Sequence, residues 1–151
     1  MSRTRTAPTA MSAARVEDAD RLYRALARLI RWTRRTSVSP VGPGTLAALG
    51  TISDCGPVRL GDLAQREGVT PATLSRIVAG LEEDGYIKRS VDPDDRRSTF
   101  VTATASGRRL VEDVRGLRAA ALLARLSRLD DEQRAALIGA LGALEALVED
   151  V

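Results

Sequence analysis

Apolar residues recur every three or four positions in four long stretches of the chain, which is the spacing of an amphipathic helix. The four stripes are Ala19, Leu22, Leu26 and Leu29 in residues 16–35; Leu74, Ile77, Val78 and Leu81 in 71–84; Leu110, Val114, Leu117 and Ala121 in 104–128; and Leu137, Leu141, Leu144 and Val148 in 130–148. Pro43 can begin another helix that runs to about residue 53. The pattern therefore predicts a mainly helical chain.

The middle of the chain carries signals for two short consecutive helices. Leu60, Leu63 and Ala64 mark the first helix, and Gly68 can end it in a left-handed cap. Thr70 is a natural N-cap for the second helix, and Pro71 is a natural first helical residue. Two short helices joined by a turn of this length predict a helix-turn-helix.

A β-hairpin is expected directly after this pair. The runs "GYIKRS" and "STFVTA" are rich in strand-forming residues, and they flank the charged tip "DPDDRR" at residues 92–97. Asp92, Pro93 and Asp94 are enough to form the turn. The two adjacent arginines are more than a turn requires, so they need another role. The alternative is a solvated tip with local ion pairs.

The C-terminal helices have clear start signals and one face rich in small side chains. Thr104 caps the first of them, and Asp130 with Gln133 forms a capping box for the second. The small residues on the flanks of the last helix are Ala136, Gly139, Ala140, Gly142 and Ala143. They would let another helix approach closely, either from a second copy or from the same chain.

Helix-turn-helix followed by a hairpin is the winged-helix order, and with its flanking helices the chain resembles the MarR family of bacterial transcription regulators. The segments that carry the resemblance are "LGDLAQREGVTPATLSRIVAGLEEDGYIKR" and "DPDDRRSTFVTATASG", within residues 16–150. Asp95, Arg97, Thr104 and Gly107 occupy the places of the family's wing motif. The resemblance implies a mainly α (α+β) fold, a winged helix-turn-helix with long flanking helices that form a dimerisation domain.

Four parts of the chain follow from these elements. We expect a disordered basic tail at 1–14, an N-terminal dimerisation helix with its linker at 15–42, the DNA-binding lobe at 43–103, and C-terminal dimerisation helices at 104–151.

The helix at 71–84 is the expected recognition helix. N-terminal residues of such a helix contact base edges, and the exposed set there is Pro71, Ala72, Thr73, Ser75 and Arg76. Arg76 suits guanine, and Ala72 suits a thymine methyl group. In the wing, the resemblance implies that Arg97 enters the minor groove while Asp95 orients it, with Arg96 beside them.

The charge of the chain is compatible with DNA binding but does not establish it. The net charge is +3 and the sequence pI is about 9.7, which is compatible with an anionic partner. Residues 71–102 hold five basic and six acidic side chains, so DNA affinity must come from a few well-placed arginines. The first helix adds a stripe of Arg21, Arg24, Arg28, Arg31 and Arg35. That stripe is either a solvated face or a further source of affinity.

Enzyme and membrane functions are not expected. With no histidine and one cysteine, the chain has no histidine-based triad, no histidine metal site and no intramolecular disulfide. No calcium loop or nucleotide-binding glycine loop is present, so we expect no metal or other cofactor. No signal peptide and no apolar run of about 18 residues is found, which predicts a cytoplasmic protein.

The expected function is a homodimeric transcriptional repressor that binds a pseudo-palindromic site in double-stranded DNA and is released by a small-molecule effector. Tyr23 and Trp32 could line the effector pocket, and each is equally expected as a packing residue. Two alternatives remain open. One is a winged helix that contacts proteins without specific DNA binding, and the other is a thiol redox sensor through Cys55.

Overall fold

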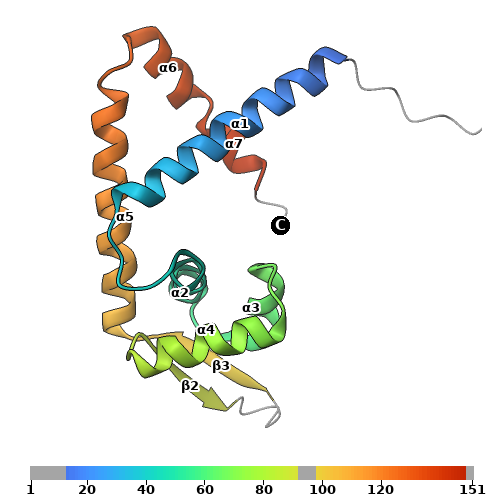
Figure 1. The fold of residues 1–151 in the computed structure, drawn as a ribbon, viewed down its shortest axis with the longest axis vertical. Helices are drawn as coiled ribbons and strands as arrows, with labels where there is room; N and C mark the ends of the chain where they lie inside the picture. Colours follow the sequence, from blue (N-terminus) through green and yellow to red (C-terminus); the bar gives the residue numbers. More distant parts are fainter. Residues whose placement is uncertain (1–12, 92–97, 149–151) are drawn as a thin grey trace, which may run out of the picture. The chain divides into compact units, whose positions relative to one another are not determined.

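The computed structural model describes residues 13–91 and 98–148, which form two compact units divided between Arg35 and Thr36. Helix α1 (Ala13–Thr36) makes up the described part of the first unit. The second unit contains, in order, α2 (Pro43–Cys55), β1 (Val58–Arg59), α3 (Leu60–Arg66), α4 (Pro71–Glu83), β2 (Ile87–Val91), β3 (Thr99–Ala103), α5 (Ala105–Leu126), α6 (Asp131–Gly139) and α7 (Leu141–Ala146) (Figure 1). The predicted mainly helical winged-helix class is confirmed.

Helices α3 and α4 form the predicted helix-turn-helix, and both end in the same glycine motif. Gly68 and Gly85 have φ angles of +61° and +74°. After each glycine, the next N–H reaches back to the helix: Val69 donates to the Ala64 carbonyl at 3.1 Å, and Tyr86 donates to the Leu81 carbonyl at 2.8 Å. This is the Schellman pattern, which only a residue that tolerates the left-handed region adopts without strain.

The wing is a three-stranded antiparallel sheet in the order β1-β3-β2. The hairpin register pairs Ile87 with Ala103 and Val91 with Thr99, as the two strand-like runs predict. Strand β1 was not predicted, because a two-residue strand is too short to show any alternation. It pairs with β3 through Val58 and Val101, so its position depends on a contact more than 40 residues away.

The core of the second unit lies between α2, α3, α4, the sheet and the start of α5. Its largest fully buried side chains are Leu49, Ile52, Leu63, Leu74, Val78, Leu81 and Val101. On α4 these are three of the four positions that the apolar stripe predicts, and the fourth, Ile77, is partly buried against the same cluster. The core therefore fixes which face of α4 is left exposed.

One backbone carbonyl joins α4, the hairpin and α5, and we call this junction the Tyr86 corner. The carbonyl oxygen of Tyr86 accepts the Thr104 N–H at 2.9 Å. The Thr104 hydroxyl donates to the Gly85 carbonyl at 2.8 Å and accepts the Gly107 N–H at 3.1 Å, so it caps α5 as predicted. Gly107 is buried, and a Cβ there would overlap the Tyr86 carbonyl oxygen.

The last helix differs from expectation. It was predicted as one segment, but it is interrupted at Ala140 between α6 and α7, where Gly139 and Gly142 on either side lower helix propensity.

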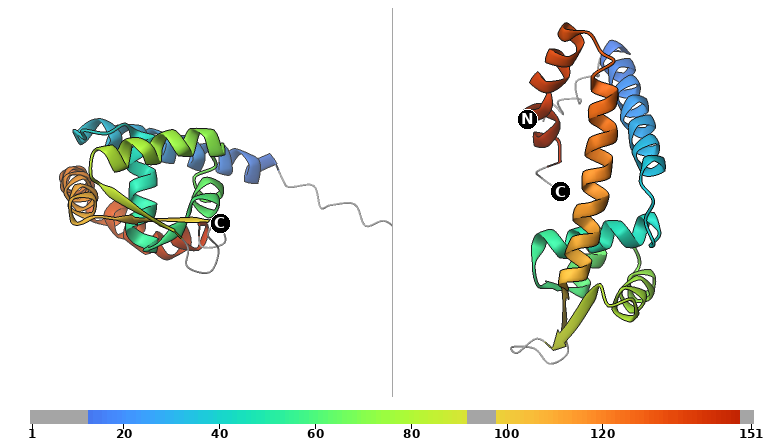
Figure 2. Two further views of the ribbon diagram at one scale, coloured as in Figure 1. Left: turned by 90° about the horizontal axis from the view of Figure 1, so that it is seen from below. Right: turned by 90° about the vertical axis from the view of Figure 1, so that its left-hand side faces the viewer.

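The apolar stripes of the outer helices are largely exposed. Most of their members after the first turns of α5 are open to solvent, including Leu117 at 53%, Leu137, Leu141 and Val148. Leu22 and Leu29 on α1 are exposed as well. Helix α5 extends away from the sheet and α6 follows its far end (Figure 1 and Figure 2), and no residue of α6 or α7 is buried.

Gly107→Ala should destabilise the protein by about 1–3 kcal/mol, because the new methyl group would overlap the Tyr86 carbonyl and press on Leu49. Gly116→Ala is the matched control on the same helix, where a Cβ meets no atom within 4 Å. It should leave stability unchanged or raise it by up to ~1 kcal/mol through helix propensity. Urea unfolding of both variants measures the difference. Equal stability of the two variants would show that the corner is not tightly packed.

Candidate nucleic-acid interface

Helix α4 presents a small, polar face to solvent. Leu74, Val78 and Leu81 are buried, and this leaves Pro71, Ala72, Thr73, Ser75 and Arg76 exposed at the N-terminal half. The five residues of α4 that are expected to contact DNA are therefore all exposed on one helix. Small side chains at these positions would let the helix backbone approach a groove closely, while Arg76 has the length to reach further.

The first turn of α4 is held by a threonine pair. The Thr70 hydroxyl accepts the Thr73 N–H at 3.2 Å and lies 3.0 Å from the Thr73 hydroxyl. Pro71 at the first helical position needs no hydrogen bond from its nitrogen. These features fix the end of the helix that would enter the groove. Among the described residues, none forms a hydrogen bond or ion pair with the Arg76 guanidinium, which is exposed.

The hairpin β2–β3 carries the segment that the sequence assigns to the minor groove. Asp95, Arg96 and Arg97 lie outside the described residues, so their expected roles stay predictions. The strands on either side are described, and they bring Val91 opposite Thr99. The described strands end at Val91 and begin again at Thr99, on either side of that segment in the sequence.

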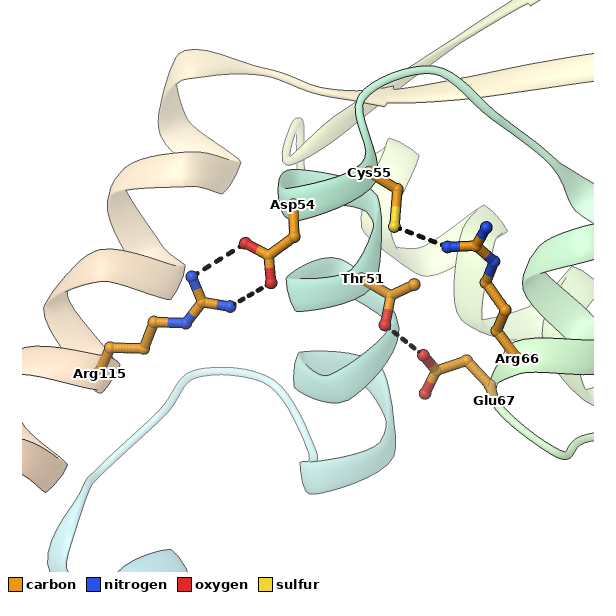
Figure 3. Close-up of polar contacts among 6 residues, drawn as sticks. All are labelled: Thr51, Asp54, Cys55, Arg66, Glu67 and Arg115. Atoms are coloured by element: carbon orange, nitrogen blue, oxygen red, sulfur yellow. Dashed lines mark hydrogen bonds and ion pairs between the residues drawn. The ribbon is translucent and has the colours of Figure 1, made fainter. Parts of the chain in front are cut away.

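Three polar contacts hold the last turn of α2, and none of them was predicted (Figure 3). On one side, both oxygens of Asp54 accept hydrogen bonds from Arg115 of α5, at 3.0 and 2.5 Å. On the other side, Thr51 donates to the Glu67 carboxylate at 2.5 Å and Cys55 Sγ accepts from Arg66 at 2.9 Å. Thr51 and Cys55 are four residues apart and so share one helical face, a signal that the sequence does contain.

The Asp54–Arg115 pair connects the DNA-binding lobe to the long helix α5. The hydrogen bonds from Arg115, more than its charge, hold the pKa of Asp54 below its ordinary value, although partial burial opposes this. The same bonds raise the pKa of Arg115. A bidentate arginine–carboxylate pair has a defined geometry as well as a charge. It therefore restrains the angle at which α2 crosses α5.

On the wing, Arg59 of β1 contacts the aromatic ring of Phe100 on β3. The Arg59 guanidinium carbon lies 5.4 Å from the centre of the Phe100 ring, and the two residues are direct neighbours across β1 and β3. A cation over a ring face is stabilised by the ring's negative electrostatic potential. Because β1 was not predicted, this residue was not among the expected contacts.

The residues expected to line an effector pocket are both on α1. Tyr23 is exposed and borders an open hollow of about 380 Å³ together with Arg24, Ala27, Arg28 and Arg31. Trp32 is half-buried and is not among the residues that line this hollow. The hollow instead brings three members of the arginine stripe beside the tyrosine ring.

The described part of the chain offers no metal site and no membrane span. Within it, no three residues of the histidine, cysteine and acidic types gather closely enough to bind an ion. None of its helices combines the length and apolarity needed to cross a bilayer.

Comparison with known proteins gives a consistent result. A model of the MarR family matches residues 43–99. An uncharacterized helix-turn-helix transcriptional regulator of Mycobacterium bovis is 36% identical over 127 residues, which cover 83% of this chain and 89% of that protein. The crystal structure of a Pseudomonas aeruginosa protein assigned as a transcriptional regulator superposes with a TM-score of 0.81 at 29% identity, covering 92% of this chain and 99% of the other.

A third comparison shows the same fold in a protein with a named ligand. Bordetella bronchiseptica BpsR, whose DNA binding is regulated by 6-hydroxynicotinic acid, superposes with a TM-score of 0.62 at 24% identity. The superposition covers 85% of this chain and 98% of BpsR.

Asp54→Asn should cost about 0.2–1 kcal/mol of stability at pH 7, the range for an ion pair that is partly exposed to solvent. Because the folded state lowers the pKa of Asp54, the contribution is complete above the ordinary value of 3.8 and is lost as the pH falls below it. A double-mutant cycle with Arg115→Gln, followed by urea unfolding between pH 7 and pH 3, measures this coupling. A coupling energy that stays constant down to pH 3 would contradict the assignment.

Proposed function

The chain belongs to the MarR family of DNA-binding transcriptional regulators, and we propose that it is a homodimeric repressor that binds a pseudo-palindromic operator and is released by a small-molecule effector. The observation that carries the proposal is the exposed, capped N-terminal half of α4, where Arg76 stands among small residues and no described residue pairs with its guanidinium. This is the shape and chemistry that a major-groove helix requires.

Base recognition would depend mainly on Arg76. A guanidinium can donate two hydrogen bonds to the O6 and N7 atoms of guanine, which no other base pair matches. Thr73 and Ser75 would contact phosphate or base edges, and Ala72 would contact a thymine methyl group. The engagement of the Thr73 hydroxyl with Thr70 supports a helix end that is already ordered before DNA arrives.

The wing would add contacts in the flanking minor groove. Arg97 would enter the groove, Asp95 would hold its guanidinium, and Arg96 would lie near the adjacent phosphates. A narrow A·T-rich groove concentrates negative potential, so such flanks would be favoured without hydrogen bonds to their bases. The antiparallel pairing of β2 and β3 supports this role, since a hairpin whose strands flank Asp95 to Arg97 in the sequence is the element that a wing requires.

The exposed apolar faces support a dimer. Helices α6 and α7 bury none of their residues in the described chain, and the large side chains left open include Leu123, Leu137, Ile138, Leu141 and Leu147. Exposed apolar side chains in such numbers mark a surface that another protein covers. A second copy would bury them and would place two α4 helices about one two-fold axis.

The proposed effector site lies on α1. The hollow beside Tyr23 contains Arg24, Arg28 and Arg31, so an anionic ligand with an aromatic ring would match it. The ligand of BpsR, a protein of the same fold, is an aromatic acid, which agrees with this chemistry. Trp32, on the same helix, would complete or support the site.

Arg76→Ala should flatten base preference at one position in each half-site, because the remaining contacts do not distinguish guanine there. Arg97→Ala should instead weaken binding by about 1–3 kcal/mol and leave the half-site preference intact. Selection from random duplexes, followed by titration at several salt concentrations, measures both effects.

Arg128→Ala is the control, since this exposed arginine follows the far end of α5, roughly 33 Å from its start at 1.5 Å per residue. It should bind like the wild type. If the wild-type protein shows no sequence preference at any salt concentration, the operator proposal fails and a protein-contact role for the winged helix is favoured.

A further inference from the structure

Strand β2 carries a positive charge on the face that should be apolar. Ile87 is buried on the side of the sheet that faces α4, and residue 89 has the same orientation because side chains alternate along a strand. Arg89 also lies directly opposite Val101, which is fully buried. Position 89 is nevertheless exposed, so the Arg89 guanidinium keeps part of its contact with water, and it also pairs with an acidic group on the neighbouring helix.

The partner is Glu82 in the last turn of α4. Arg89 Nε lies 2.8 Å from a carboxylate oxygen of Glu82, and the two side chains are 33% and 43% exposed. Glu82 follows the buried Leu81 and lies one turn after the buried Val78, so it occupies the border of the helix face that packs on the sheet. The ion pair therefore spans the contact between the recognition helix and the hairpin.

The pair with Arg89 also offsets negative charge at the C-terminal end of α4, where Glu82 lies. Glu82, Glu83 and Asp84 are three consecutive acidic residues at the C-terminal end of α4, where the helix dipole is already negative. Arg89 supplies the opposite charge to this end from the neighbouring strand. Of the other salt bridges in the described chain, Asp54–Arg115 connects α2 to α5, whereas pairs such as Asp20 with Arg24 lie within one helix.

We propose that Glu82 and Arg89 are positioning residues, which set the spacing between the bases that α4 contacts and the minor groove that the hairpin reaches. The proposal rests on the DNA-binding function proposed above. The Tyr86 corner, the pairing of β3 with β1 and the buried Ile87 fix the start of β2 relative to α4. The ion pair adds a contact between α4 and β2 three residues after Tyr86, at a point of the strand where the residues after Ile87 are exposed.

Two other roles would use the same residues differently. Strand β2 is at the edge of the sheet, and an inward-pointing charge on an edge strand also discourages pairing with another chain. Alternatively, Arg89 could leave Glu82 and contact a phosphate directly. Positioning of the hairpin, protection of the sheet edge and phosphate contact predict different results for the single variants Glu82→Gln and Arg89→Gln.

The test compares two selected operators that share their half-sites and differ only in A·T-rich or G·C-rich flanks. Glu82→Gln and Arg89→Gln should each reduce the preference for A·T-rich flanks by about two- to fivefold, the factor that corresponds to loss of one partly exposed ion pair. The half-site preference and the midpoint of thermal unfolding should change little. The charge-reversed double variant E82R/R89E should recover most of the flank preference, because the pair is restored in the opposite sense.

Asp20→Asn is the matched control, since it removes a carboxylate whose oxygen lies 2.9 Å from the Nε of Arg24. It should leave the flank preference unchanged. Far-UV circular dichroism confirms that each variant is folded, and if Arg89→Gln is not, Glu82→Gln and the double variant decide the question.

Three results would overturn the inference. Flank preferences equal to wild type in both single variants would show that the pair positions nothing. Tighter binding by Glu82→Gln with uniformly weaker binding by Arg89→Gln would identify Arg89 as a phosphate contact. Self-association of the variants with unchanged flank preference would assign the pair to protection of the sheet edge. If the wild-type protein itself selects no half-site, the proposed DNA-binding function is wrong. That result differs from the three above, in which the wild-type protein does select a half-site.

Discussion

The carbonyl group of Tyr86 is the point on which the geometry of the DNA-binding lobe depends. It follows the glycine that ends α4, it accepts the N–H of the residue that caps α5, and Gly107 packs directly against it. The end of the recognition helix, both strands of the hairpin and the start of α5 therefore meet within a few residues. A side chain at position 107 or a different residue at position 85 would separate them, since neither position tolerates a Cβ without strain.

The contacts around α2 extend this rigid arrangement toward the outer helices. Asp54 binds Arg115 of α5, while Thr51 and Cys55 bind the last residues of α3. Helix α2 therefore connects the helix-turn-helix to α5, the element that leads to the exposed apolar faces of α6 and α7. If those faces form a dimer, as we propose, the separation of two α4 helices would depend on how α5 is held at α2.

Much of the lobe could be predicted from the sequence because its signals are local. Gly68, Thr70, Pro71 and Gly85 each specify a helix end through their own backbone or side-chain chemistry, and the hairpin follows from two strand-like runs. Strand β1, the α2 contacts and the Glu82–Arg89 pair could not be found this way, since each depends on residues brought together by the fold. The apolar stripes of α6 and α7 were correctly placed on helices, but periodicity does not say whether a face is covered by the same chain or by another.

Helical phasing of the operator tests the symmetric mechanism most directly. Two α4 helices related by a two-fold axis must enter major grooves on one face of the duplex, so the half-sites should be inverted copies about 10 bp apart, centre to centre. Inserting about five base pairs, or half a turn, between them should collapse the affinity measured by titration, while an insertion of about ten should restore it only partly, because a rigid dimer cannot span the longer distance. Affinity that is indifferent to both insertions, on a short site without inverted symmetry, would contradict the account.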